Sequence, residues 1–115
     1  MANILITEFM DEAQVELLSV NHNVTYDPEL YKNSKTLLKE SSNAHALIVR
    51  NKTNVDEKLL DSMNHLKVVG RLGVGLDNID VNFCDTKNVP VIIADGANAR
   101  SVSEYIIMGL LTLFR

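Results

Sequence analysis

Five short runs of mainly apolar residues recur along the chain, and they constrain its fold more than any other feature of the sequence. Because these runs are apolar almost throughout, they are typical of strands that are buried on both faces. The segments between them have the apolar spacing of helices, and strands that alternate with helices form a parallel sheet. Five such strands in fewer than 100 residues favour the flavodoxin-like strand order 2-1-3-4-5. The sequence therefore predicts a doubly wound α/β fold with a five-stranded parallel sheet, whose strands lie at residues 3–7, 24–26, 44–49, 66–71 and 89–94.

Local signals mark where the intervening helices should begin. Asp27 followed by Pro28 is typical of a helix start, with the aspartate as cap and the proline in the first turn. Asn54 is a second candidate cap, and two acidic residues occupy the favourable first turn behind it. We expect helical segments, of which the second is one helix or two short ones, at residues 8–20, 28–41, 54–63, 78–88 and 99–115.

The composition narrows the class of protein and of partner. The 115 residues suffice for one domain with a core, and a net charge of −4 gives no reason to expect nucleic acid or an anionic membrane as partner. A single cysteine, Cys84, excludes an internal disulfide and fits a reducing, cytoplasmic environment. The apolar run at residues 105–114 is too short to span a bilayer. His45 is expected in the core or at an interface, and His22 and His65 lack partners at metal-ligand spacing, so we expect no metal site.

A glycine loop (residues 70–80) follows the fourth predicted strand and carries Gly70, Gly73 and Gly75. Glycine allows positive φ and leaves main-chain N–H groups uncovered, so a small anion such as a carboxylate could bind there. The alternative is a tight strand-to-helix turn without a ligand. The position of the glycine loop relative to the predicted strands favours a bound ligand. The glycine loop, the arginine loop (residues 50–53) and residues 95–98 all follow predicted strands, at the carboxyl edge where parallel sheets bind ligands.

Two polar side chains at this edge are candidates for binding an anion. Arg50 closes a buried strand, where its guanidinium could hold a carboxylate through two hydrogen bonds, although spacing alone favours a surface ion pair with a helix carboxylate. Asn98 precedes a helix, so it either caps that helix or contacts a ligand. The glycine loop is not a dinucleotide fingerprint, because Leu76 to Asn78 stand in place of the third glycine of G-x-G-x-x-G.

Several motifs taken together resemble a known family. Residues 70–80, 89–91 and 96–104 are similar to the first domain of the D-isomer-specific 2-hydroxyacid dehydrogenases, with the phosphoglycerate dehydrogenase branch most similar. The arginine loop resembles the family's Arg-Ser-x-Thr segment, with Asn51 in place of the serine. The resemblance covers the whole chain in layout and is specific over its second half.

The resemblance implies a role for each matching residue. Arg50, with Asn51 beside it, would hold the carboxylate or phosphate end of the substrate. The main-chain amides of Val74 and Gly75 would bind the substrate carboxylate, and Val74 would also lie near the nicotinamide of NAD. Asn98 would face the substrate at the cleft between two domains.

The resemblance also implies a domain layout. Residues 1–98 would form the N-terminal portion of the substrate-binding domain, and residues 99–115 would be a hinge helix leading to a nucleotide-binding domain. Family members carry G-x-G-x-x-G and an acid/base histidine in that second domain, and these 115 residues contain neither motif. Hydride transfer requires both parts. We therefore expect no catalytic residue in this chain, weak or no NAD binding by it alone, and no turnover.

Two functions stay open. The first is the substrate-binding part of an NAD-dependent oxidoreductase that acts on the CH–OH group of a D-2-hydroxy acid, with small 2-hydroxy and 2-oxo acids as ligands. The alternative is a stand-alone module that binds a small carboxylate and has no enzyme activity. A receiver-like signalling domain is disfavoured, because only Glu8 follows the first strand where a receiver has clustered acidic residues. The last predicted helix has apolar residues on more than one face, which predicts a homodimer formed through Ile106, Ile107, Leu110, Leu111, Leu113 and Phe114.

Overall fold

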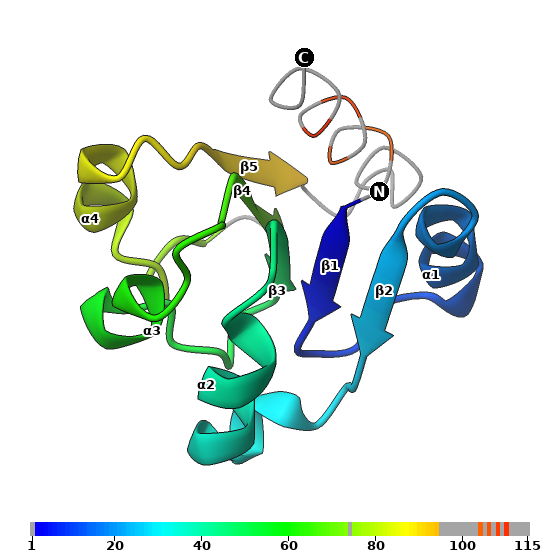
Figure 1. Cartoon of the computed structure of the whole chain (residues 1–115), viewed down its shortest axis with the longest axis horizontal. Coiled ribbons are helices and arrows are strands. Elements are labelled where there is room, and N and C mark those ends of the chain that lie inside the picture. The colour runs from blue at the N-terminus through cyan, green and yellow to red at the C-terminus, as the bar shows by residue number, and fades with distance from the viewer. Residues whose placement is uncertain are drawn as a thin grey trace.

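The computed structural model describes residues 2–73 and 75–94, together with residues 104, 106, 108 and 110. A sheet of five parallel strands in the order β2-β1-β3-β4-β5 forms its centre (Figure 1). This order confirms the predicted flavodoxin-like, doubly wound fold. The strands are β1 (Asn3–Ile6), β2 (Asn23–Tyr26), β3 (Ala46–Val49), β4 (Val68–Leu72) and β5 (Val91–Ala94).

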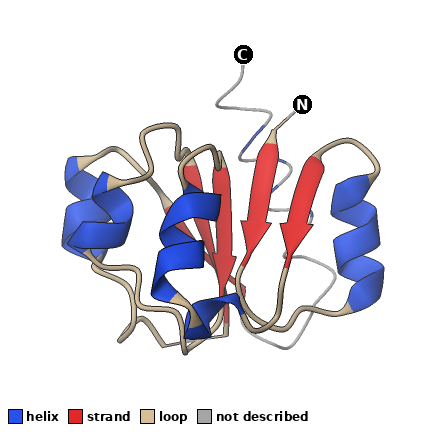
Figure 2. Ribbon diagram, turned by 60° about the horizontal axis from the view of Figure 1, so that its bottom comes forward, coloured by secondary structure: helices blue, strands red, loops and turns tan. Residues whose placement is uncertain are grey.

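Helices cover both faces of the sheet (Figure 2). The helix α1 (Glu12–Ser19) packs on one face. A short 3-10 turn, η1 (Leu30–Lys32), leads into α2 (Ser34–Ser41) on the other face, which also carries α3 (Glu57–Asp61) and α4 (Val81–Thr86).

Successive residues of the central strands point to opposite faces, and both faces are buried. In β1 and β3, Ile4, Ile6 and Ile48 pack in the same cluster as α1. Leu5 and Leu47 pack in the cluster that contains α2 and α3. All five side chains are at most 2% exposed. Burial on both faces is the reason why these strands are continuously apolar.

Part of the predicted C-terminal helix covers the same face as α1. Ile106 and Leu110 are helical and buried in the cluster with β3 and β4. A Cβ atom at Gly70 would lie 2.7 Å from Cδ1 of Ile106, so β4 has a glycine where this segment approaches closely. Since Ile106 and Leu110 are covered by this chain's own sheet, they are not available to a partner chain, and the homodimer stays a prediction. Most of residues 99–115 lies outside the described residues, and no helix of the described part is long and apolar enough to cross a membrane.

The predicted start of the third helix is wrong by two residues. The helix α3 is capped by Asp56, whose Oδ1 accepts the N–H of Leu59 at 3.0 Å, and not by Asn54. Val55 forms an isolated parallel bridge with Ile79. A residue held in an extended bridge cannot also begin a helix, so the tertiary contact displaces the start.

The prediction that Asp27 and Pro28 begin a helix is also wrong. The Asp27 side chain accepts the N–H of Glu29 at 2.9 Å in a turn, and α2 begins only after Asn33. The side chain of Asn33 accepts the N–H of Thr36 at 3.2 Å. The helices α1 and α4 also start later than predicted, and the caps of the four α-helices are Asp11, Asn33, Asp56 and Asp80.

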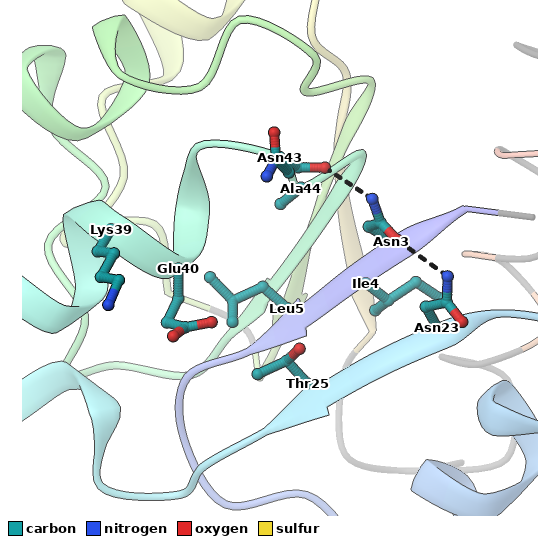
Figure 3. Close-up of a pocket in the computed structure, with 9 residues that line it drawn as sticks. All are labelled: Asn3, Ile4, Leu5, Asn23, Thr25, Lys39, Glu40, Asn43 and Ala44. Atoms are coloured by element: carbon teal, nitrogen blue, oxygen red, sulfur yellow. Dashed lines mark hydrogen bonds between the residues drawn. The ribbon is translucent and has the colours of Figure 1, made fainter.

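A cavity of about 380 Å³ opens at the amino end of the sheet (Figure 3). Asn3 joins its two sides, because Nδ2 of Asn3 donates to the carbonyl of Asn43 at 3.1 Å and Oδ1 of Asn3 accepts from Nδ2 of Asn23 at 3.2 Å. Lys39 and Glu40 of α2 also line the cavity. Parallel sheets bind ligands at their opposite edge, so this cavity is not the expected place for a ligand.

Two histidines near the amino end of the sheet accept hydrogen bonds from the start of the chain. Nδ1 of His22 accepts the N–H of Ala2 at 3.1 Å, and Nδ1 of His45 accepts the N–H of Asn3 at 2.9 Å. Burial lowers the pKa of both side chains below the usual 6.5, and repulsion from His65 lowers the pKa of His45 further. A protonated nitrogen cannot accept a hydrogen bond, so folding favours the neutral imidazoles.

We therefore expect the free energy of unfolding to decrease as the pH falls below 6.5. The unfolded chain protonates these histidines first, so it binds more protons than the folded chain, and stability is complete only above this pH. Urea unfolding at about pH 7.5 and about pH 5.5 measures the change. In the double variant His22→Asn, His45→Asn the side chains still accept but no longer titrate, and the dependence should be weaker. If the free energy of unfolding depends on pH equally in both proteins, His22 and His45 are not the cause of that dependence.

Candidate functional site

Two loops lie side by side at the carboxyl edge of the sheet. The arginine loop follows β3, and the glycine loop includes the end of β4 and the residues after it. Because β3 and β4 are paired in parallel, both loops emerge at the same edge. Beyond the arginine loop, the N–H of Val55 donates to the carbonyl of Asn78 at 2.8 Å, and the N–H of Asp80 donates to the carbonyl of Val55 at 2.9 Å. The glycine loop is therefore joined by main-chain hydrogen bonds to the segment that directly follows the arginine loop.

A buried carboxylate binds the main chain of the arginine loop. Glu8, directly after β1 and Thr7, is 3% exposed. Its Oε2 accepts the N–H groups of Arg50 at 2.7 Å and Thr53 at 3.0 Å, and its Oε1 accepts the N–H of Lys52 at 3.0 Å. Three donors compensate the cost of removing a carboxylate from water. The N–H groups of Arg50, Lys52 and Thr53 are therefore engaged by Glu8 and are not open main-chain donors.

A side-chain amide holds the same loop from the glycine loop. Nδ2 of Asn78 donates to the carbonyls of Arg50 and Thr53, each at 2.8 Å. The hydroxyls of Thr7 and Thr53 share a hydrogen bond of 2.7 Å, and both residues are at most 1% exposed. The first and last residues of the arginine loop are thus fixed on both sides.

An internal arginine shapes the glycine loop. Arg71, in β4, is 7% exposed, and its Nε donates to the carbonyl of Gly75 at 2.7 Å while Nη1 donates to the carbonyl of Leu72. Gly73 has a φ of 131°, which confirms that a glycine of this loop adopts positive φ. A Cβ atom at Gly73 would collide with the Arg71 guanidinium, so any other residue there would both displace that guanidinium and adopt an unfavourable φ.

Two cavities flank Asn51 at this edge. One, of about 420 Å³, has the cationic side chains Arg50 and Lys52 on its wall, and Nζ of Lys52 lies 5.4 Å from the centre of the Tyr31 ring. The other, of about 370 Å³, is bordered by Gly75. Because Asn51 borders both, the arginine loop and the glycine loop contribute to adjoining hollows. The first cavity is completed by Glu8, Phe9, Pro28 and Glu29, and the second by Asn54, Arg71, Asp77 and Asn78.

The carboxylates beside the first cavity are already engaged. Glu8 accepts three main-chain hydrogen bonds, and Glu29 pairs with Lys32 at 2.7 Å, which lowers the pKa of Glu29. Arg50 is exposed and makes no ion pair with any described residue. The surface ion pair that spacing alone favoured for Arg50 is therefore not found in the described part of the chain.

The predicted binding residues fall into two groups. Arg50, Asn51 and Gly75 lie at this edge and border the adjoining cavities. Val74 and Asn98 lie outside the described residues. The described residues contain no group of three or more His, Cys, Asp or Glu side chains placed to hold a metal ion.

Sequence reasoning did not assign a role at this edge to Glu8, Arg71 or Asn78. Glu8 carried a usable signal, because an acidic residue directly after a buried first strand lies at the same edge as the arginine loop. Arg71 and Asn78 carried none, since a polar residue in a loop has many possible partners.

Comparisons with known proteins identify the family of the chain. Residues 4–108 match the family model described as D-isomer specific 2-hydroxyacid dehydrogenase, catalytic domain. The chain is 47% identical over 115 residues to (S)-sulfolactate dehydrogenase of Chromohalobacter salexigens, a match that covers 100% of this chain and 37% of that protein. It is 36% identical over 111 residues to D-3-phosphoglycerate dehydrogenase of Methanocaldococcus jannaschii, covering 96% of this chain and 21% of that protein.

A solved structure shows the same similarity. The cofactor (NAD+)-bound 3-phosphoglycerate dehydrogenase of Entamoeba histolytica matches with a TM-score of 0.71 at 25% identity, covering 93% of this chain and 37% of that one. The chain thus spans 37% or less of the length of each of these relatives. Since the family model matches nearly the whole chain, the protein belongs to the D-isomer specific 2-hydroxyacid dehydrogenase family, within the part described as its catalytic domain.

Proposed function

We propose that this chain is the substrate-binding part of an NAD-dependent oxidoreductase that acts on the CH–OH group of a 2-hydroxy acid. The observation that carries the proposal is the junction of the arginine loop with the glycine loop, where Asn51 borders the cavities of both Arg50 and Gly75. An exposed guanidinium that forms no ion pair within the described part of the chain suits a carboxylate, phosphate or sulfonate. The family of the chain and the NAD+-bound relative support the reaction class and the cofactor.

The substrate proposed here carries a second acidic group besides the 2-hydroxy acid carboxylate. Sulfolactate and 3-phosphoglycerate, after which two relatives are named, each have one. In this proposal the main-chain amides of Val74 and Gly75 bind the carboxylate, and Arg50 holds the second anion with Lys52 nearby. The identity with a sulfolactate dehydrogenase is the higher of the two, so we place sulfolactate before phosphoglycerate.

Residues outside this chain would have to bind the dinucleotide. When bound, NAD accepts the hydride from the substrate carbon. The glycine loop is a poor cradle for a pyrophosphate, because it lacks the third glycine of a dinucleotide fingerprint. The loop instead suits the smaller carboxylate of the substrate.

The chain's own histidines lie away from the site. His22, His45 and His65 precede β2, β3 and β4, at the amino edge of the sheet. A general base must lie within hydrogen-bond reach of the proton it abstracts, so none of the three can serve at the carboxyl edge. For this reason we propose that the 115-residue chain alone does not oxidise its substrate. The alternative function, a stand-alone module that binds a small carboxylate, uses the same site without the reaction.

A fusion protein tests the proposal. Residues 1–115 replace the matching 37% of the Chromohalobacter salexigens sulfolactate dehydrogenase, whose remaining chain stays intact. We expect NADH formation from sulfolactate or 3-phosphoglycerate by the fusion, and none by the 115-residue chain alone. NADH formation by the isolated chain would refute the proposed division of labour. A folded fusion that binds NAD yet oxidises neither acid would favour the stand-alone module.

A further inference from the structure

The arginine loop folds around the carboxylate of Glu8, a residue that lies outside the loop. Glu8 is separated from Arg50 by 42 residues of sequence, yet its carboxylate accepts the N–H groups of three of the four residues of this loop. A buried carboxylate requires such donors, because an ionised group without hydrogen bonds is costly to bury. The loop therefore curls around Glu8, and the conformation of its backbone depends on that carboxylate.

Asn78 completes this hold from the opposite side. Its amide donates both of its hydrogens, one to the carbonyl of Arg50 and one to that of Thr53. Three N–H groups of the loop thus point to Glu8, and two of its carbonyls point to Asn78. Arg50, Asn51 and Lys52 have exposed side chains, while Thr53 is buried.

We propose that Glu8 and Asn78 are positioning residues, which fix the arginine loop so that its exposed side chains are ordered for an anionic substrate before that substrate arrives. Asn78 belongs to the glycine loop, so it also sets the spacing between the two halves of the site. This inference rests on the proposed function, because it assumes that the two loops bind one ligand. Ordering a site in advance removes an entropic cost of binding, so loss of the hold should weaken affinity.

The expected effect of Glu8→Gln is an affinity about 10-fold lower. Glutamine offers one acceptor oxygen in place of two, and its own NH₂ group would face an N–H of the loop. Glu8→Asp keeps the two charged oxygens on a shorter side chain and should recover part of the affinity. Asn78→Ala removes the two donors without changing the charge and should also weaken binding. Leu18→Ala is the matched control, since Leu18 is buried under the opposite face of the sheet and its loss destabilises the chain away from the site.

The test uses the 115-residue chain with sulfolactate as the probe. Calorimetry gives the dissociation constant. Amide hydrogen exchange at Lys52 and Thr53 reports directly on their hydrogen bonds to Glu8, with or without a ligand. In Glu8→Gln and Asn78→Ala we expect weaker binding, and exchange at both amides that rises more than exchange in the core strands. Leu18→Ala should bind as the unaltered chain does, and its exchange at these two amides should rise no more than in the core strands. Should Glu8→Gln fail to fold, Asn78→Ala and Glu8→Asp decide the outcome.

Two results separate this inference from the proposed function. If the unaltered chain binds sulfolactate and both variants bind it equally well, the positioning role is wrong while the proposed function stands. If the unaltered chain binds neither sulfolactate nor 3-phosphoglycerate, the proposed function fails, and with it the role in binding. Unchanged exchange at Lys52 and Thr53 in both variants would show that Glu8 and Asn78 do not fix the arginine loop.

Discussion

Replacing Arg50 with glutamine in the fusion protein is expected to lower kcat/KM for the 2-hydroxy acid about 100-fold. Arg50 is exposed, lines the 420 Å³ cavity and makes no ion pair with any described residue, and the proposed function assigns its guanidinium to the substrate. The loss of two charge-assisted hydrogen bonds costs about 2 to 3 kcal/mol, which corresponds to this factor. Initial rates of NADH formation over a range of substrate concentrations measure the change.

We expect the planar guanidinium of Arg50, and not only its charge, to determine the rate. Arg50→Lys keeps the positive charge but loses the planar pair of donors, so it should restore only part of the activity. Lys39→Gln removes one positive charge at the amino-end cavity and should leave the rate unchanged. If Arg50→Gln lowers the rate no more than Lys39→Gln does, Arg50 does not bind the substrate.

Gly73→Ala should destabilise the chain by about 2 to 3 kcal/mol. The φ of 131° at this position is unfavourable for any residue with a Cβ atom, and that atom would collide with the Arg71 guanidinium. Arg71 cannot move freely, because it holds the carbonyls of Leu72 and Gly75. Urea unfolding with an unchanged m-value gives the difference.

Gly75→Ala provides the matched control for this prediction. A Cβ atom at Gly75 would lie 3.7 Å from the nearest atom of Arg71, an ordinary contact. Its unfolding midpoint should therefore stay close to that of the unaltered chain. Equal midpoints for Gly73→Ala and Gly75→Ala would show that neither the positive φ nor the Arg71 contact limits the loop.

The strands could be predicted because their signal is local. Residues such as Leu5, Ile48 and Val69 are buried on one face or the other, so the strands contain few polar residues and stand out from their surroundings. The strand order followed from the number and spacing of these runs. The starts of the helices were less predictable, because a contact between distant residues decided them. The bridge from Val55 to Ile79 moved the cap of α3 from Asn54 to Asp56.

In the candidate site too, features set by neighbouring residues in the sequence could be predicted, and contacts between distant residues could not. Arg50 and Gly75 could be placed at the carboxyl edge because each follows a predicted strand. The position of Glu8 after a buried strand places it at the same edge, but its hydrogen bonds to the arginine loop and those of Asn78 could not be predicted, because they join residues 42 and 28 positions apart. Arg71 was equally hidden, since its contacts with the glycine loop arise only from the turn at Gly73.

The most direct test of a substrate site between the two loops is an NMR titration of the 115-residue chain with sulfolactate and with 3-phosphoglycerate. We predict saturable shifts of the amide signals of Asn51, Lys52 and Gly75, with a dissociation constant on the order of millimolar for half of an active site. We also predict that Arg50→Gln abolishes these shifts and that Asn3 and Asn23 at the amino-end cavity do not respond. Shifts that gather at the amino-end cavity, or no saturable shift in either loop, would contradict the account.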